Sequence, residues 1–338
     1  MKYSVIIPVY NRPDEVEELL GSLARQSFKD FEAIVVEDGS ALPCKDVVDR
    51  YSQQINVTYL WKENGGPAAA RNMGVEACSG EYVLILDSDC VVPDGYLNAV
   101  EQELLQHPCD AFGGPDKAHS GFSPLQKAIN YTMTSFFTTG GIRGGKKKLD
   151  KFYPRSFNMG MKRSCYKALG GFSADMRFGE DIDLSLRIFE AGYSCRLFPS
   201  AWVWHKRRTD LKKFFRQVIN SGIARIHLAK RHPGSMKLVH MLPAAFTLGC
   251  ILLLVCSLIC PYALLPLLLY ATLLMTDAAL KEKSIWVGCL AIPAAFVQLG
   301  GYGLGFLWAW WQRCVLGKGE FGAFRKNFYK YQLFVACN

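Results

Sequence analysis

The first 110 residues alternate short apolar runs with segments whose apolar residues recur at helical spacing. SVIIPVY at 4–10 and DEVEELLGSLARQS at 14–27 predict the first strand and the first helix of this pattern. Further strands are predicted at 31–40, 57–63 and 81–89, with helices at 46–55 and 67–78 between them. Strands that alternate with helices in this way favour an α/β fold with a mostly parallel sheet.

Each predicted strand ends in polar side chains. In chain order these residues are Asn11, then Glu37 and Asp38, then Asn64, then Asp87 and Asp89. Ligands of open parallel sheets bind beyond the carboxyl ends of the strands. We therefore expect these side chains to converge on one crevice.

The last of these strand ends carries two acids, in YVLILDSD. Residues i and i+2 of a strand point to the same face, so Asp87 and Asp89 are expected to lie side by side. Two carboxylates in that arrangement suit Mg²⁺ or Mn²⁺, which bridge substrate phosphates in such sites. The alternative for these three residues on their own is simple turn chemistry.

The last hundred residues are far more apolar. Residues 241–276 and 285–311 contain no charged side chain. Because about 20 apolar residues span the hydrocarbon of a bilayer, the first run predicts a helical hairpin turning near Pro261 and the second predicts one long tilted helix. Small and aromatic residues suited to helix packing in lipid and to an interfacial belt follow at Gly300, Gly301, Gly303, Gly305, Trp308, Trp310 and Trp311. The alternative is a pair of buried helices in a large soluble core.

These patterns divide the chain into a globular domain at 1–204, a basic segment at 205–240, about three spans at 241–311 and a basic tail at 312–338. The apolar run at the N-terminus is too short for a signal peptide, so we expect a multi-pass protein of the cytoplasmic (inner) membrane with the globular domain in the cytosol. The 12 cysteines form no CxxC pair, which fits a reducing compartment without a disulfide framework.

The positive charge has one location. Residues 201–240 contain ten Lys or Arg against Asp210 alone, which accounts for the net charge of +9. Since this cluster directly precedes the apolar runs, it indicates anionic membrane lipids rather than nucleic acid as the partner. Residues 211–232 mix apolar and basic positions and predict an amphipathic helix in the head-group plane.

The number of crossings stays open at this stage. Three crossings put the tail outside the cell, yet positively charged tails favour the cytosol. The tail contains one acid, Glu320, and the cations outnumber it: Arg313, Lys318, Arg325, Lys326 and Lys330. Two crossings, four crossings or a re-entrant segment would each remove the conflict.

Six strings occur along the chain in the order VIIPVYNRPDEVEELLGSLARQ, VVEDGS, NGGPAAARNMG, LDSD, GGF and FGEDIDLSLRI. In these strings the chain resembles family 2 glycosyltransferases over residues 3–215. The resemblance implies the GT-A fold, a Rossmann-like mixed sheet with helices on both faces, and a nucleotide-diphosphate sugar as donor. The stretch from WVWHKRR into the apolar runs is similar to the bacterial subgroup that builds exopolysaccharide repeat units on lipid carriers, such as succinoglycan-type transferases.

The resemblance implies donor-binding roles for Pro8, Tyr10, Glu37, Asp38, Arg71 and Asp87. Asp38 would accept hydrogen bonds from uracil or sugar hydroxyls, whereas many relatives have Asp at the position of Glu37. Arg71 would bind the donor phosphates through its positive charge. The alternative interpretation is that Arg71 is a helix arginine exposed to solvent.

The resemblance also implies a metal site. Asp89 would be the direct ligand, Asp87 would serve the ribose and metal region, and His205 would complete the shell. A lone histidine beside a strand is otherwise structural. Mn²⁺ or Mg²⁺ is expected, and the imidazole favours Mn²⁺.

Three acids open a predicted helix at FGEDIDLSLRI, where carboxylates also complement the helix dipole. The resemblance implies that Asp181 is the general base, with a pKa raised by partial desolvation, and that Glu180 orients the acceptor. Arg187 is predicted to be a structural partner of a nearby acid. The implied reaction is a single displacement with inversion.

Gln217 is followed by Val218, Ile219, Asn220 and Ser221, so the Gln-x-x-Arg-Trp motif of processive relatives is absent here. We therefore expect non-processive transfer of one sugar. The expected acceptor is a polyprenyl-diphosphate-linked saccharide, with a hydroxy or glycerolipid second. The rival functions are a membrane-bound nucleotidyltransferase and a non-catalytic sugar-nucleotide binding protein. The sugar itself is not readable from the pattern.

Overall fold

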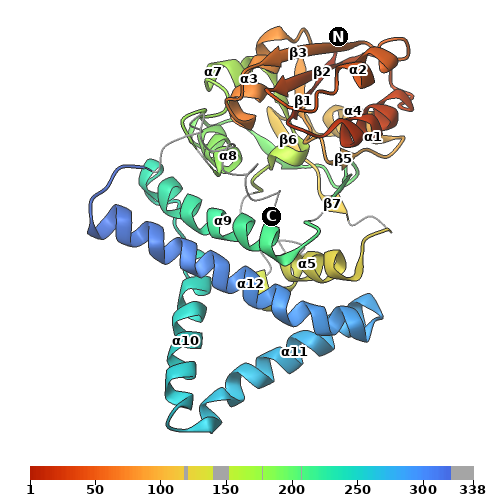
Figure 1. Cartoon of the computed structure of the whole chain (residues 1–338). Helices are drawn as coiled ribbons and strands as arrows, with labels where there is room; N and C mark the ends of the chain where they lie inside the picture. Colours follow the sequence, from red (N-terminus) through yellow and green to blue (C-terminus); the bar gives the residue numbers. More distant parts are fainter. Residues whose placement is uncertain (118–120, 140–151, 177, 207, 321–338) are drawn as a thin grey trace. The chain divides into compact units, whose positions relative to one another are not determined.

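A computed structural model describes the chain except for residues 118–120, 140–151, 177, 207 and 321–338 (Figure 1). The Gly-rich stretch 138–148, predicted to be a mobile loop, lies almost entirely outside the described residues, as does the tail beyond Glu320. The described residues group into two compact units. The sheet unit holds those of 1–117 and 152–206, and the helical unit holds those of 118–151 and 208–320.

The main sheet has seven strands in the order β3-β2-β1-β4-β8-β6-β9. Its strands are β1 (Tyr3–Val9), β2 (Phe31–Asp38), β3 (Val57–Lys62), β4 (Tyr82–Ile85), β6 (Ala111–Gly113), β8 (Met159–Lys162) and β9 (Cys195–Leu197). The first four are parallel, and β8 runs antiparallel between β4 and β6. The predicted mixed, mostly parallel sheet is therefore confirmed.

Helices cover both faces of this sheet. They are α1 (Pro13–Ala24), α2 (Lys45–Tyr51), α3 (Pro67–Ala77), α4 (Tyr96–Gln106), α7 (Arg163–Ala168) and α8 (Glu180–Glu190). Neighbouring residues of β1 point to opposite faces, so Val5 packs in a core with α1, α2 and α4, whereas Ile6 packs in a second core with α3, α7 and α8. Burial on both faces explains why these strands are almost continuously apolar.

The predicted fourth strand is too long. β4 ends at Ile85, so Asp87 and Asp89 lie in the connection to β5 (Cys90–Val91) and not on one face of a strand. β5 belongs to a small sheet in which β10 (Val203–His205) lies between β5 and β7 (Asp116–Lys117). In this sheet His205 is opposite Cys90.

The helical unit contains the predicted hairpin and the predicted long helix. Its helices are α5 (Pro124–Thr134), α6 (Phe136–Thr139), α9 (Leu211–Arg231), α10 (Leu242–Ser257), α11 (Leu265–Glu282) and α12 (Ile285–Trp310). The hairpin of α10 and α11 turns at Pro261–Leu264, as predicted. Within the described residues, Pro261–Glu282 and Ile285–Val315 are long and apolar enough to cross a membrane, whereas α10 has only 16 residues.

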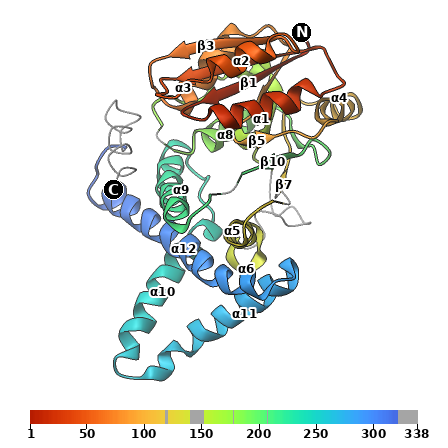
Figure 2. The ribbon, with the colours of Figure 1, turned by 45° about the vertical axis from the view of Figure 1, so that its right-hand side comes forward.

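The predicted amphipathic helix is α9, but its apolar face is not available to lipid. Phe214, Val218 and Leu228 are buried, and α9 packs along α12. Glycine permits this contact, because a Cβ on Gly222 would collide with the backbone of Tyr302. The side-by-side course of the two helices is clear in both orientations (Figure 2).

Candidate active site

Arg71 is a buried cation that joins the segment after β4 to the start of α8. Its Nη2 donates to Asp87 Oδ1 at 2.8 Å, and its Nη1 donates to Glu180 Oε1 at 2.9 Å. The guanidinium also lies 5.0 Å from the ring centroid of Phe172. Burial alone would lower the pKa of Arg71, but the charges of Asp87 and Glu180 raise it above its usual value.

This arrangement changes the environment expected for Arg71. The alternative of a solvated helix arginine is wrong, because the side chain is 4% exposed. Both Nη atoms already face carboxylates, and Nε is buried without a hydrogen-bond partner among the described residues. A contact between Arg71 and the donor phosphates stays a prediction.

Asp38 organises the turn that leads into α3. Its two carboxylate oxygens accept hydrogen bonds from the backbone N–H groups of Gly65 and Gly66, each at 2.8 Å. Lys62 Nζ also donates to Asp38 Oδ1 at 2.7 Å. Gly66 has φ 91°, a conformation that favours glycine, which is why the sequence NGGP can turn here. Asp38 is thus at the carboxyl edge of β2, as predicted.

Glu37 points away from Asp38 because neighbouring strand residues alternate faces. It is fully buried and accepts hydrogen bonds from the backbone N–H of Cys44 at 2.7 Å and from the hydroxyl of Ser40. These contacts hold the loop after β2. The structure does not bring Glu37 to the other predicted donor residues.

Pro8 and Tyr10 lie at the carboxyl end of β1 and are partly exposed. The next residue, Asn11, has φ 54°, which asparagine tolerates better than most residues. Asn11 Oδ1 accepts hydrogen bonds from the N–H groups of Ala41 and Leu42 at 2.7 and 3.0 Å. The ends of β1 and β2 are therefore tied together at this edge.

Asp89 and His205 form a second cluster. Asp89 Oδ1 lies 3.3 Å from His205 Nε2, and Asp89 Oδ2 accepts a hydrogen bond from Arg12 Nη1 at 2.7 Å. On the other side of the ring, His205 Nδ1 is 3.8 Å from Asp116 Oδ2. Burial would lower the pKa of His205, but Asp116 and Asp89 raise it to about 9. Arg12 and Asp116 were not among the predicted site residues.

This cluster fits a divalent cation. Ligand atoms of Asp89, Cys90 and His205 lie within 4.8 Å of one another. Apart from the ion-pair contacts with each other's residues and with Asp116, the buried Asp89 Oδ1 and His205 Nδ1 make no hydrogen bond among the described residues, and a cation would satisfy such atoms. Cys90 Sγ instead donates to the carbonyl of Phe157 at 3.4 Å, and a thiol suits a hard cation poorly. The group does not include Asp87, which pairs with Arg71.

The start of α8 holds the predicted base. Asp181 Oδ2 accepts a hydrogen bond from Arg155 Nε at 2.7 Å, and its Oδ1 accepts one from the N–H of Ile182 at 2.8 Å. The expected upward shift is wrong for this residue. Burial raises the pKa of Asp181, but the charge and the hydrogen bond of Arg155 more than offset this, and the pKa is lowered. The neighbouring Glu180 has a raised pKa, chiefly because it is buried.

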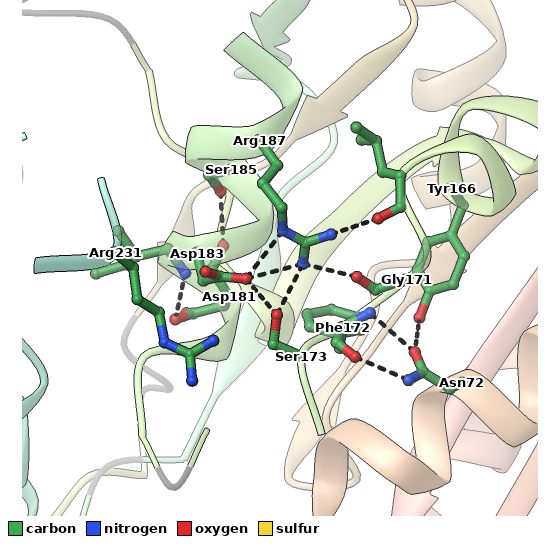
Figure 3. A network of polar contacts seen from close by, with 12 residues as sticks. Asn72, Tyr166, Gly171, Phe172, Ser173, Asp181, Asp183, Ser185, Arg187 and Arg231 are labelled. Carbon is green, nitrogen blue, oxygen red and sulfur yellow. Dashed lines mark hydrogen bonds and ion pairs between the residues drawn. The ribbon is translucent and has the colours of Figure 1, made fainter. Parts of the chain in front are cut away.

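The third acid of this helix, Asp183, lies in a denser network (Figure 3). Arg187 pairs with it at 2.8 Å, as predicted for a structural arginine. Ser173 Oγ donates to the same carboxylate oxygen at 2.6 Å. Arg187 further donates to the carbonyls of Leu169 and Gly171 at 2.6 and 2.7 Å. This network fixes the connection between α7 and α8.

Sequence reasoning missed four charged residues at these sites: Arg12, Lys62, Asp116 and Arg155. Arg12 follows the first strand directly in YNRPDE, so its position could have suggested it. Asp116 and Arg155 lie far along the chain from the partners they meet, and no local pattern marks them. The pairing of β10 with β7 brings Asp116 close to His205.

The family described as Glycosyl transferase family 2 matches residues 4–170. This range includes β1 to β4, Arg71, Asp87 and Asp89, and it ends before Asp181 and His205.

Two curated relatives match parts of the chain. A pre-mycofactocin glycosyltransferase of Mycobacterium tuberculosis is 31% identical over 240 residues, which are 68% of this chain and 48% of the relative. The poly(ribitol-phosphate) beta-N-acetylglucosaminyltransferase TarS of Staphylococcus aureus is 42% identical over 114 residues, which are 32% of this chain and 20% of TarS. The chain thus spans less than two thirds of the length of either relative.

Solved structures share the fold. The mannosyltransferase PcManGT from Pyrobaculum calidifontis, in complex with GDP-Man and Mn²⁺, has a TM-score of 0.62 and 21% identity, covering 91% of this chain and 87% of its own. Residues 1–349 of TarS from S. aureus, in complex with UDP, have a TM-score of 0.50 and 19% identity, covering 96% of this chain and 95% of their own. At these identities the likeness concerns the fold.

Proposed function

The chain carries a glycosyltransferase family 2 domain with the GT-A fold, and we propose that it transfers a sugar from a nucleotide-diphosphate sugar to a hydroxyl group. The sequence predicts both this family and this fold, and both predictions are confirmed. The narrower resemblance to succinoglycan-type transferases stays a prediction.

One observation carries the proposal. The carboxyl ends of parallel strands and the start of α8 hold acids and arginines in direct contact, through Asp87, Arg71 and Glu180. Open parallel sheets bind ligands at this edge, and a site with both carboxylates and fixed cations suits a diphosphate and its metal ion. The GDP-Man and UDP bound in the two solved structures support a nucleotide sugar, and UDP-sugar is our first choice of donor.

Asp89 and His205 are the residues proposed to hold Mn²⁺ or Mg²⁺, with Mn²⁺ favoured by the imidazole. A bound cation would neutralise charge on the departing diphosphate. The Mn²⁺ in the PcManGT structure supports this choice. Pro8, Tyr10, Asp38 and Asp87 are proposed to contact the nucleotide and sugar.

Asp181 is proposed as the general base, and Glu180 orients the acceptor. As the acceptor oxygen bonds to the anomeric carbon, its proton passes to Asp181, and the bond from that carbon to the diphosphate oxygen breaks. The electron pair of the broken bond leaves with the diphosphate. Because the acceptor attacks from the side opposite the departing diphosphate, the configuration inverts. The lowered pKa of Asp181 keeps the carboxylate ionised at neutral pH, as a base must be, but it also makes the carboxylate a weaker base than one with a raised pKa. The role therefore rests on the position of Asp181 beside Glu180 and not on its pKa.

The helical unit points to a membrane acceptor. The hairpin exposes Leu258, Ile259 and Tyr262, and α9 adds a basic surface suited to anionic lipids. We propose that the protein attaches to the cytoplasmic membrane with its catalytic unit in the cytosol. It would add one sugar to a polyprenyl-diphosphate-linked saccharide, with a hydroxy or glycerolipid as second choice.

The test uses purified full-length protein, a panel of radiolabelled nucleotide sugars, Mn²⁺ or Mg²⁺, and bacterial membranes. We expect label to pass from one donor into an organic-soluble lipid fraction. Label that stays wholly water-soluble while donor is consumed would exclude a lipid acceptor. If every donor stays intact with either metal, the proposed transfer is wrong.

A further inference from the structure

A charged helix and an uncharged one run side by side in the helical unit (Figures 1 and 2). α9 carries six cations, Lys212, Lys213, Arg216, Arg225, Lys230 and Arg231, which extend from its first turn to its last. α12 has no charged residue over its 26 positions and is one of the two helices long enough to cross a membrane. By composition alone, α12 would be taken as a membrane span.

The contact follows α9 and the second half of α12. Successive close approaches pair Val218 with Gly301, Ile219 with Gly305, and Gly222 with Phe306. Beyond the end of α12, Glu320 pairs with Arg231 at 2.8 Å and with His227 at 3.0 Å. Because both helices run in the same direction, α9 accompanies the second half of α12 along its length.

This side-by-side course limits where α12 can lie. Charged side chains are excluded from hydrocarbon unless they are paired or reach the head groups. If α12 crossed the bilayer, the cations of α9 alongside it would be drawn through the hydrocarbon. A position at the membrane surface avoids this and leaves Leu304 and Trp308, both exposed, to contact lipid.

The two ends of the hairpin that lie away from its turn, the start of α10 and the end of α11, both pack against α12. At the start of α10, the carbonyl of Pro243 approaches Gly303, and near the end of α11 the carbonyl of Met275 approaches Gly288. The end of α11 is also charged, since Asp277 pairs with Lys281 at 2.8 Å. The turn between α10 and α11 is uncharged, and Leu258 and Ile259 there are 85% and 91% exposed.

We propose that α12 does not cross the membrane but lies along its surface, with α9 on its aqueous side, and that only the α10–α11 hairpin enters the lipid. Ser284 and Lys318, at the two ends of α12, are then on the same side of the membrane as α9. This places Arg313 and Lys318 on the side that carries the catalytic unit and removes the conflict with the positive-inside rule. The inference rests on the proposed membrane attachment and not on sugar transfer.

The test is site-resolved labelling of the full chain in membrane vesicles. Ser284→Cys, Lys318→Cys and, as a reference in the sheet unit, Gln53→Cys are treated with a membrane-impermeant maleimide. Right-side-out and inside-out vesicles are compared, and peptide mass spectrometry separates these sites from the native cysteines. We expect all three to be labelled several-fold more in the inside-out vesicles.

Labelling of 284 and 318 in opposite preparations would show that α12 crosses the bilayer and would overturn the proposal. Labelling of either position only after detergent would place that end in hydrocarbon, with the same consequence. A chain found wholly in the soluble fraction would refute membrane attachment itself. The donor assay reports separately on sugar transfer.

Discussion

Asp181 and Asp183 stand two residues apart in the first turn of α8, and each pairs with an arginine. Asp183 meets two nitrogens of Arg187 and the hydroxyl of Ser173, and Arg187 is held in turn by two backbone carbonyls. Asp181 receives one side-chain hydrogen bond, from Arg155, whose side chain is 34% exposed. The residue types are alike, but the degree of restraint differs.

This difference in restraint distinguishes an ion pair that only stabilises the fold from one whose carboxylate can take part in the reaction. A carboxylate whose partners are all fixed cannot exchange them for a substrate without breaking the fold around it. A carboxylate held by one partly exposed arginine can accept a proton from a substrate hydroxyl while the helix stays in place. Complementing the helix dipole explains both acids equally well, so only their contacts distinguish them.

The largest expected effect is on turnover in Asp181→Asn. The amide cannot take the acceptor proton, so we expect kcat to fall by about 10²–10⁴-fold, the usual contribution of a general base. The nucleotide should bind as before, since the proposed donor contacts are elsewhere. Radiolabel transfer and calorimetric titration with UDP measure the two quantities. Unchanged turnover would remove Asp181 from the mechanism.

The second effect is on stability in Arg187→Ala. Removing this arginine leaves the buried Asp183 carboxylate without its ion pair, and breaking a buried pair costs about 3 kcal/mol or more. Urea unfolding followed by circular dichroism measures the loss. Because Arg187 has no proposed contact with substrate, the protein that remains folded should keep its kcat. A stable variant with a low kcat would reverse the two assignments.

Arg155→Ala should have a smaller effect that depends on pH. We expect kcat to fall about tenfold from poorer positioning of Asp181, with Arg155→Lys recovering part of it. Arg155 lowers the pKa of Asp181, so its removal moves the acid limb of the pH–rate profile to higher pH. Arg71 also favours the ionised carboxylate, whereas Glu180 opposes it. A rate loss without a shift of the limb would contradict the positioning role.

The same pair predicts a stability difference between the parent and Arg155→Ala. Because the folded state lowers the pKa of Asp181, the ion pair stabilises the fold above the ordinary pKa of Asp. This contribution is lost as the pH falls through the lowered pKa. Melting curves of the two proteins should therefore converge in acid. Curves that stay equally far apart at every pH would show that the pair does not contribute in this way.

The smallest effect is expected for Lys45→Ala. Lys45 and Asp49 are four residues apart in the sequence, as are Asp183 and Arg187. Lys45 Nζ lies 2.6 Å from Asp49 Oδ2. Both side chains are more than half exposed, and surface pairs of this spacing contribute about 0.3–0.5 kcal/mol. Urea unfolding measures the difference. A loss as large as that of Arg187→Ala would mean that burial does not decide the strength of these pairs.

Local patterns in the sequence determined most of the fold and part of the site. Apolar runs and helical spacing identify the four parallel strands, the helices between them and the hairpin near Pro261, because burial repeats along each element. The ends of the strands identify Asp38, Asp87 and Asp89. The DSD stretch shows the limit of this reasoning, since β4 stops at Ile85 and its two acids meet different partners.

The tertiary structure alone decided which charges meet. Arg155 reaches Asp181, Arg12 reaches Asp89, and Asp116 approaches His205 only after distant segments pack together. The same holds for α9 and α12, where uncharged residues predict a span and only the packing of α12 beside a basic helix supports the proposed position at the membrane surface. The apolar residues that a helix or strand buries recur at a regular spacing along the sequence, so a local pattern predicts them. The strength of an ion pair depends on separation in space and on shielding from water, which a linear order does not contain.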